Sequence, residues 1–125
     1  MTENQISYKI RGCIFKVYKT LGPGLLESVY EAALAYELVN EGLIVKSQVP
    51  IPVIYNEINL DLGFRADLII NDKVIIEIKS VEHLAEVHHK QVLTYLKLTS
   101  YKLGILVNFN TGDINEAIFR KVNGL

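Results

Sequence analysis

Residues 64–79 constrain the fold most strongly, because two apolar runs flank a short polar turn. The runs are Leu68-Ile69-Ile70 and Val74-Ile75-Ile76, and Asn71-Asp72-Lys73 lies between them. This pattern predicts a β-hairpin. Three charged side chains stand inside or at the end of its strands, and a buried charge is costly unless it is paired or bound to a metal. The hairpin therefore predicts a functional site at Asp67, Glu77 and Lys79.

The register of the hairpin decides whether these charges can meet. A two-residue turn at Asn71-Asp72 would place Asp67 opposite Ile76, and the two carboxylates would point to opposite faces of the sheet. A three-residue loop places Asp67 opposite Glu77 and makes the other face entirely apolar. Because a slip of one residue exchanges the faces, we expect the three-residue register. One face would then carry Arg65, Asp67, Ile69, Ile75, Glu77 and Lys79, and the other Leu68, Ile70, Val74, Ile76 and Ile78.

The rest of the chain alternates between helical and extended patterns. Apolar residues at helical spacing predict helices over residues 4–20, 25–40 and 84–98, with Gly42 as the stop of the second. Residues 44–53 predict an edge strand or a strand that ends early, because of their two prolines, and residues 57–62 lead into the hairpin. Residues 102–108 predict a buried strand and 117–122 a last strand or short helix. We expect one α/β domain over residues 1–125, with a mixed sheet and an N-terminal helical hairpin.

Composition is that of an ordinary globular protein, with 50% apolar residues and a formal net charge of −1. No apolar run approaches the length of about 20 residues that a membrane span needs. The N-terminus lacks the basic start and apolar core of a signal peptide, so we expect a cytoplasmic protein. The one cysteine, Cys13, stands at an apolar helical position, which favours a buried, unreactive thiol.

The charged residues of the hairpin suit metal-dependent chemistry. Two carboxylates on one face, Asp67 and Glu77, can bind Mg²⁺ or Mn²⁺, and the carbonyl of Ile78 could add a further oxygen. Lys79 could orient water or pair with charge developing on a phosphate. The alternative on spacing alone is a surface ladder of salt bridges.

Polar side chains on two helices are candidate neighbours of this site. Gln91 and Tyr95 are four residues apart and share a helical face, although a core role for Tyr95 fits as well. His88 continues that face, with a surface position as its alternative. Glu27 opens the second helix and could supply another carboxylate, although the helix dipole alone favours an acid there.

Three motifs in order resemble a known superfamily. Asp67 followed by Glu77-Ile78-Lys79 resembles the PD-(D/E)XK nucleases, with Ala66 in place of the usual proline. Residues 91–95 (QVLTY) are similar to the QxxxY motif of the recombination-exonuclease-like branch. Residues 24–30 (GLLESVY) look like the signature of the GxxExxY protein family. Tyr18 stands where relatives often carry a histidine.

The resemblance implies a restriction-endonuclease-like core, with a mixed sheet of four or more strands flanked by helices. It implies a nuclease dependent on Mg²⁺ or Mn²⁺ and acting on DNA. Asp67, Glu77, Glu27 and the Ile78 carbonyl would hold the metal, and Lys79 would be the catalytic lysine. Gln91 and Tyr95 match the helical site residues of the branch.

The alternative is a catalytically inactive nuclease fold that binds nucleic acid or a protein partner. The complete set of Asp67, Glu77 and Lys79 favours the enzyme, since a binding module does not need all three. The short chain favours the module, because 125 residues leave little room for recognising a substrate. A homodimer would answer that objection by placing two sites across a duplex.

Overall fold

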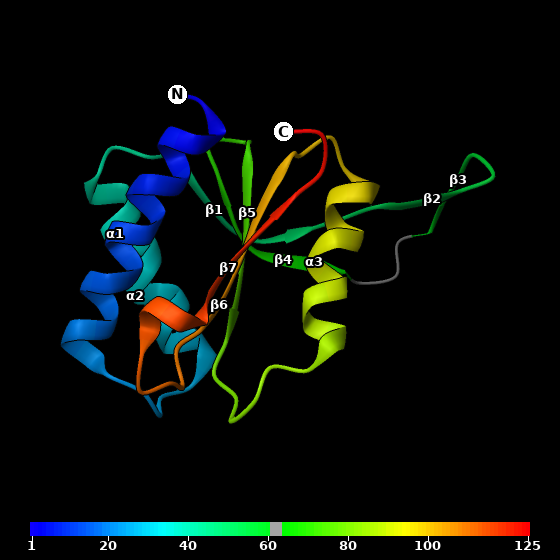
Figure 1. The fold of residues 1–125 in the computed structure, drawn as a ribbon. Coiled ribbons are helices and arrows are strands. Elements are labelled where there is room, and N and C mark those ends of the chain that lie inside the picture. Colours follow the sequence, from blue (N-terminus) through cyan, green and yellow to red (C-terminus); the bar gives the residue numbers. More distant parts are fainter. Residues whose placement is uncertain (61–63) are drawn as a thin grey trace.

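The computed structural model describes residues 1–60 and 64–125, which form a three-layered α/β arrangement (Figure 1). The central five-stranded sheet has the order β1-β4-β5-β6-β7. Helices α1 and α2 cover one face and α3 the other, which confirms the expected restriction-endonuclease-like architecture. The helices are α1 (Glu3–Leu21), α2 (Glu27–Asn40), α3 (Glu86–Leu98) and the short 3-10 helix η1 (Ile114–Ala117). The strands are β1 (Val45–Pro50), β2 (Val53–Tyr55), β3 (Ile58–Leu60), β4 (Arg65–Ile70), β5 (Val74–Lys79), β6 (Leu103–Asn108) and β7 (Ile118–Val122).

The three predicted helices are present, with shifts of one or two residues at their ends. Thr2 and Gln5 form a capping box at the start of α1, which satisfies backbone N–H groups that the helix leaves free. Gly42 has a φ of +83° just beyond α2, as expected for a glycine that ends a helix. Within residues 1–60 and 64–125, no helix combines the length and apolar character needed to cross a membrane.

The sheet is mixed, because β5 and β6 are parallel and the other neighbouring strands are antiparallel. Strand β1 lies at the edge and also ends early, at Pro50, so both readings of its prolines are confirmed. The prediction missed the separate hairpin of β2 and β3, which projects away from the sheet (Figure 1). Asn56 and Glu57 form its turn at φ values of 48° and 66°. Residues 61 and 62, predicted to lead into the next strand, lie outside the described residues.

Each face of the sheet has its own apolar core. The larger core joins α1 and α2 to the side chains of Leu68, Ile70, Val74, Ile76 and Ile78. The smaller core joins Tyr95 and Leu96 of α3 to Ile69 and Ile75. The apolar face predicted for the hairpin is therefore confirmed, and the face with the carboxylates is the one that α3 covers.

Gly104 on β6 sets how closely α3 approaches the sheet. A Cβ atom at this position would lie 2.5 Å from Cγ1 of Val92, which is shorter than any ordinary contact. Val92 is buried and β-branched, so its side chain cannot easily turn away. The glycine thus lets α3 carry Gln91 and Tyr95 close to the carboxylates.

We expect Gly104→Ala to lower the free energy of unfolding by about 1–3 kcal/mol, because the added methyl overpacks a filled core. Denaturant unfolding should show a lower midpoint with an unchanged slope. The double variant with Val92→Ala removes the clashing methyl group and should recover part of the loss. Equal midpoints for wild type and Gly104→Ala would contradict this account.

Candidate active site

The β4–β5 hairpin has the register predicted from its sequence. Ile69 pairs with Ile75 and Ile70 with Val74, so the loop between the strands has three residues. Asn71 and Asp72 adopt φ values of 52° and 51°, a conformation that these two residue types tolerate better than most. The register places Asp67 level with Glu77, and the charge of Asp67 acts on the Glu77 carboxyl group.

The two strands stop pairing at this point. The last pair of the ladder is Leu68 with Ile76, and beyond it the Asp67 side chain takes the place of a backbone partner. Its Oδ2 accepts a hydrogen bond from the backbone N–H of Ile78 at 2.8 Å. This bond ties the carboxylate of one strand to the backbone of the next and fixes its position.

Glu77 is the most unusual group of the site, because it is a carboxyl group with 3% exposure in the middle of a sheet. Its Oε1 is buried without a hydrogen-bond partner. Burial, followed by the charge of Asp67, raises the pKa of Glu77 from 4.5 to about 9, and the charge of Lys79 acts in the opposite direction. The metal-free protein therefore holds Glu77 protonated at neutral pH.

Lys79 ends β5, where it pairs with Asn108 of the parallel strand β6. Its carbonyl accepts a hydrogen bond from the N–H of Phe109, which anchors the backbone. The side chain is half-buried, and its charge acts on Glu77. Among the described residues, no acidic side chain lies within 4 Å of its ammonium group. The ammonium group is thus available to a ligand.

Helix α3 brings Tyr95 to the carboxylates. Tyr95 is 3% exposed. Its burial and, to a smaller extent, the negative charges of Glu77 and Asp67 raise its pKa to about 12. A phenol with this pKa stays protonated and can donate a hydrogen bond toward the acids or a ligand. Gln91 lies one turn earlier and is half-buried. His88 instead caps α3, because its Nδ1 accepts the N–H of Ala85 at 3.0 Å.

Helix α2 contributes two carboxylates with different neighbours. Oε1 of Glu27 accepts the N–H of Ser80 at 3.3 Å, so this acid lies beside the residue that follows Lys79. Glu31, one turn later, accepts a hydrogen bond from Gln48 at 2.6 Å. Burial raises the pKa of Glu31, and the charge of Asp67 adds to the shift. The structure therefore couples Glu31 to Asp67, whereas Glu27 accepts a hydrogen bond from the backbone at Ser80.

Tyr30 of the GLLESVY segment organises the turn between α1 and α2. Its hydroxyl group donates to the carbonyl of Gly22 at 2.6 Å and accepts the N–H of Leu25 at 3.1 Å. Its ring stacks on Phe109 with a centroid distance of 4.3 Å. These contacts fix the start of α2, and hence Glu27, relative to the end of β6.

The oxygen groups at Asp67 and Glu77 fit a hard divalent cation. Mg²⁺ and Mn²⁺ favour carboxylate oxygens, and the unpartnered Oε1 of Glu77 is the kind of buried atom that a cation would satisfy. Within residues 1–60 and 64–125, no three acidic, histidine or cysteine side chains are close enough to enclose a metal. A cation here would complete its shell with water or substrate oxygens, as Mg²⁺ commonly does. The roles of Glu27 and the Ile78 carbonyl as ligands stay predictions.

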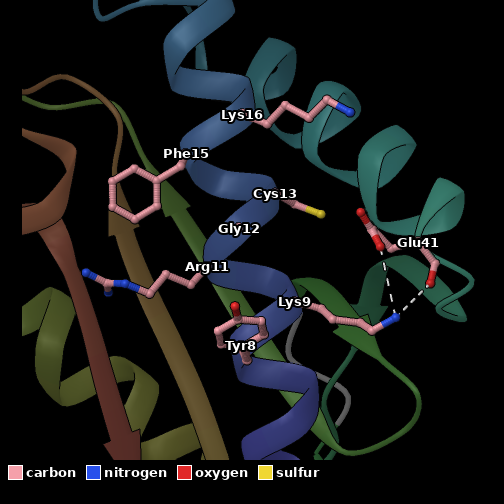
Figure 2. Close-up of a pocket in the computed structure, with 8 residues that line it drawn as sticks. All are labelled: Tyr8, Lys9, Arg11, Gly12, Cys13, Phe15, Lys16 and Glu41. Atoms are coloured by element: carbon pink, nitrogen blue, oxygen red, sulfur yellow. Dashed lines mark hydrogen bonds and ion pairs between the residues drawn. The ribbon is translucent and has the colours of Figure 1, made fainter.

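A groove of about 460 Å³ lies elsewhere, over α1 (Figure 2). Lys9 and Lys16 point toward α2, where Lys9 contacts Glu41, while Arg11 and Phe15 lie on the opposite side of the helix. Burial and, to a smaller extent, the charges of Glu41 and Glu37 raise the pKa of Cys13 to about 11, so its thiol stays protonated. The expectation that Cys13 is buried is confirmed, and its raised pKa does not favour a role as a nucleophile.

Comparison with known proteins supports a nuclease-like fold. The family model of the PD-(D/E)XK nuclease superfamily matches residues 4–121, which run from the second residue of α1 to the next-to-last residue of β7. Comparison with curated proteins gave no significant match. Comparison with solved structures gave none either. From the extent of the family match, the chain belongs to the PD-(D/E)XK nuclease superfamily.

Proposed function

We propose that the protein is a metal-dependent nuclease that hydrolyses phosphodiester bonds of DNA. The observation that carries the proposal is the buried Glu77 carboxyl group, with its unpartnered oxygen, beside Asp67. A structural ion pair would not explain it, because no ion pair of Glu77 is present among the described residues. A buried carboxyl group that keeps its proton at neutral pH would exchange that proton for a cation when a metal binds.

Asp67 and Glu77 would hold Mg²⁺ or Mn²⁺. The cation would supply positive charge against the phosphate oxygens and make water a better nucleophile. The Ile78 N–H keeps the Asp67 carboxylate in place, so its orientation does not depend on the ligand. Lys79 can pair with the charge that develops on the phosphate as the bond to the leaving oxygen breaks. The Tyr95 hydroxyl and the Gln91 amide can donate hydrogen bonds to phosphate oxygens or to the attacking water.

We further propose that the chain belongs to the GxxExxY group, within the branch that carries the QxxxY motif. Two arrangements support the assignment. Gly24, Glu27 and Tyr30 lie at the turn that places α2 beside the end of β5, and Gln91 and Tyr95 lie on α3 near the carboxylates. A homodimer with two sites facing one duplex is the arrangement that would suit so short a chain.

The proposal is tested with purified protein and linear, single-stranded, branched and circular DNA, and with RNA. We expect cleavage of DNA in Mn²⁺ or Mg²⁺ and none in a chelator. Asp67→Asn should reduce it at least about 100-fold, because one ligand of the cation is lost. Asp72→Asn is the matched control, since Asp72 is an exposed aspartate in the turn of the same hairpin.

Three outcomes decide the matter. Cleavage that survives Asp67→Asn would come from a contaminant and would count against the proposal. Absence of cleavage, together with no heat of Mn²⁺ binding, would favour a non-catalytic module. Cleavage of RNA alone would keep the chemistry and overturn the assignment to DNA.

A further inference from the structure

Gln48 occupies an unusual backbone position on the edge strand β1. Its φ is +52°, a conformation that is unfavourable for a residue with a side chain. Ser47 pairs with Leu68 and Val49 with Ala66, which places Gln48 level with Asp67. Gln48 is therefore the strained residue nearest in register to a candidate metal ligand, and strain of this kind gathers at functional sites.

The side chain of Gln48 links two carboxylates. Its Nε2 donates to Oε1 of Glu31 at 2.6 Å and lies 3.4 Å from Oδ1 of Asp67. The other oxygen of Asp67 accepts the N–H of Ile78. Both oxygens of Asp67 thus have a donor, one from β1 and one from β5. An amide suits the place between two carboxylates because its NH₂ group supplies two donors and carries no charge that would compete with a cation.

A second contact holds the strained backbone. Nη1 of Arg65 donates to the carbonyl of Gln48 at 3.2 Å, from the start of the neighbouring strand β4. A glycine would adopt the same φ without strain, but it would provide no amide. The backbone conformation alone therefore does not require glutamine, and what glutamine adds at this position is its side-chain amide.

We propose that Gln48 is a positioning residue, which holds the Asp67 carboxylate in its metal-binding orientation and ties it to Glu31 of α2. The effect of Gln48 on catalysis rests on the proposed function, whereas its contacts with Asp67 and Glu31 do not. Gln48 acts through Asp67 and does not itself touch the metal or the reacting atoms. Such supporting contacts commonly change metal affinity by 10- to 100-fold.

The test is Gln48→Gly, which keeps the backbone conformation and removes the amide. We expect the metal-free variant to melt at the wild-type temperature or above, because the strain is relieved. The Ile78 amide should exchange its hydrogen faster, since the Asp67 acceptor is no longer held, while the Ile76 amide is unchanged. Calorimetric titration with Mn²⁺ should show an affinity about 10- to 100-fold weaker.

Asn56→Gly is the matched control, because it relieves a positive φ of 48° in the β2–β3 turn. It should leave both the Ile78 exchange and Mn²⁺ affinity unchanged. Unchanged Ile78 exchange in Gln48→Gly would overturn the inference whatever the metal result. A lower melting temperature with faster exchange throughout the sheet would also overturn it, because Gln48 would then be merely structural. If wild-type protein binds no Mn²⁺, the proposed function fails, and the exchange of Ile78 still decides whether Gln48 positions Asp67.

Discussion

Replacement of Glu77 by Gln is expected to stabilise the metal-free protein at pH 8 by a few kcal/mol while abolishing metal-dependent cleavage. Glu77 is 3% exposed, and burial together with the neighbouring Asp67 raises its pKa to about 9. Glutamine has nearly the same shape, stays neutral at every pH, and its amide can donate to Asp67. The variant thus removes the unfavourable ionisation and keeps the packing.

The sign of the pH dependence follows from the two pKa values. An unfolded chain ionises Glu77 near its ordinary value of 4.5, and the folded protein does so only near 9. Between these values the folded state binds a proton that the unfolded state has released, so wild-type stability falls as the pH rises. Each pH unit in this window costs up to about 1.4 kcal/mol. The two proteins should be similar below pH 4.5 and should differ increasingly up to pH 9.

Denaturant unfolding of both proteins in a chelator, at pH 5 and pH 8, measures this difference. Glu82→Gln is the control, because the Glu82 side chain is 90% exposed and its replacement should change stability little at either pH. A constant difference between wild type and Glu77→Gln at the two pH values would show that the protonation of Glu77 is not linked to folding. A less stable variant at pH 8 would contradict the argument more directly.

The sequence was sufficient to predict the hairpin because its information is local. A two-residue period, a turn of three polar residues and one all-apolar face leave only one favourable register, and Ile69 pairs with Ile75 as that register requires. The edge position of β1 followed from its prolines for a similar reason. Local signals also located α1 and α2 within about two residues.

The supporting contacts of the site could not be predicted, because they join segments far apart in the chain. Gln48 and Glu31 meet Asp67 only after β1 has paired with β4 and α2 has packed nearby. The sequence pointed to Glu27 through a motif, but it carried no sign that Glu31 would be the acid linked to Asp67. The β2–β3 hairpin was missed because its strands have only three residues each.

Replacement of Lys79 by Ala is expected to reduce cleavage about 100- to 1,000-fold without weakening Mn²⁺ binding. The ammonium group has no acidic partner within 4 Å among the described residues, and its charge lowers the pKa of Glu77. Its removal takes away a positive charge that can stabilise the transition state, which commonly costs this much in rate. It also removes repulsion of the cation, so affinity for Mn²⁺ should stay the same or increase.

Cleavage rates at saturating Mn²⁺, measured together with calorimetric affinities, separate this role from that of the carboxylates. Asp67→Asn should lose both binding and cleavage, whereas Lys79→Ala should lose cleavage alone. Lys73→Ala is the control on the same hairpin, since Lys73 is exposed and donates to the Met1 carbonyl far along the sequence. If Lys79→Ala bound Mn²⁺ as poorly as Asp67→Asn, Lys79 would be needed to form the metal site and not for the chemistry. If it cleaved at the wild-type rate, the transition-state charge would have to be offset by another group, and Tyr95 and Gln91 on α3 would be the next residues to replace.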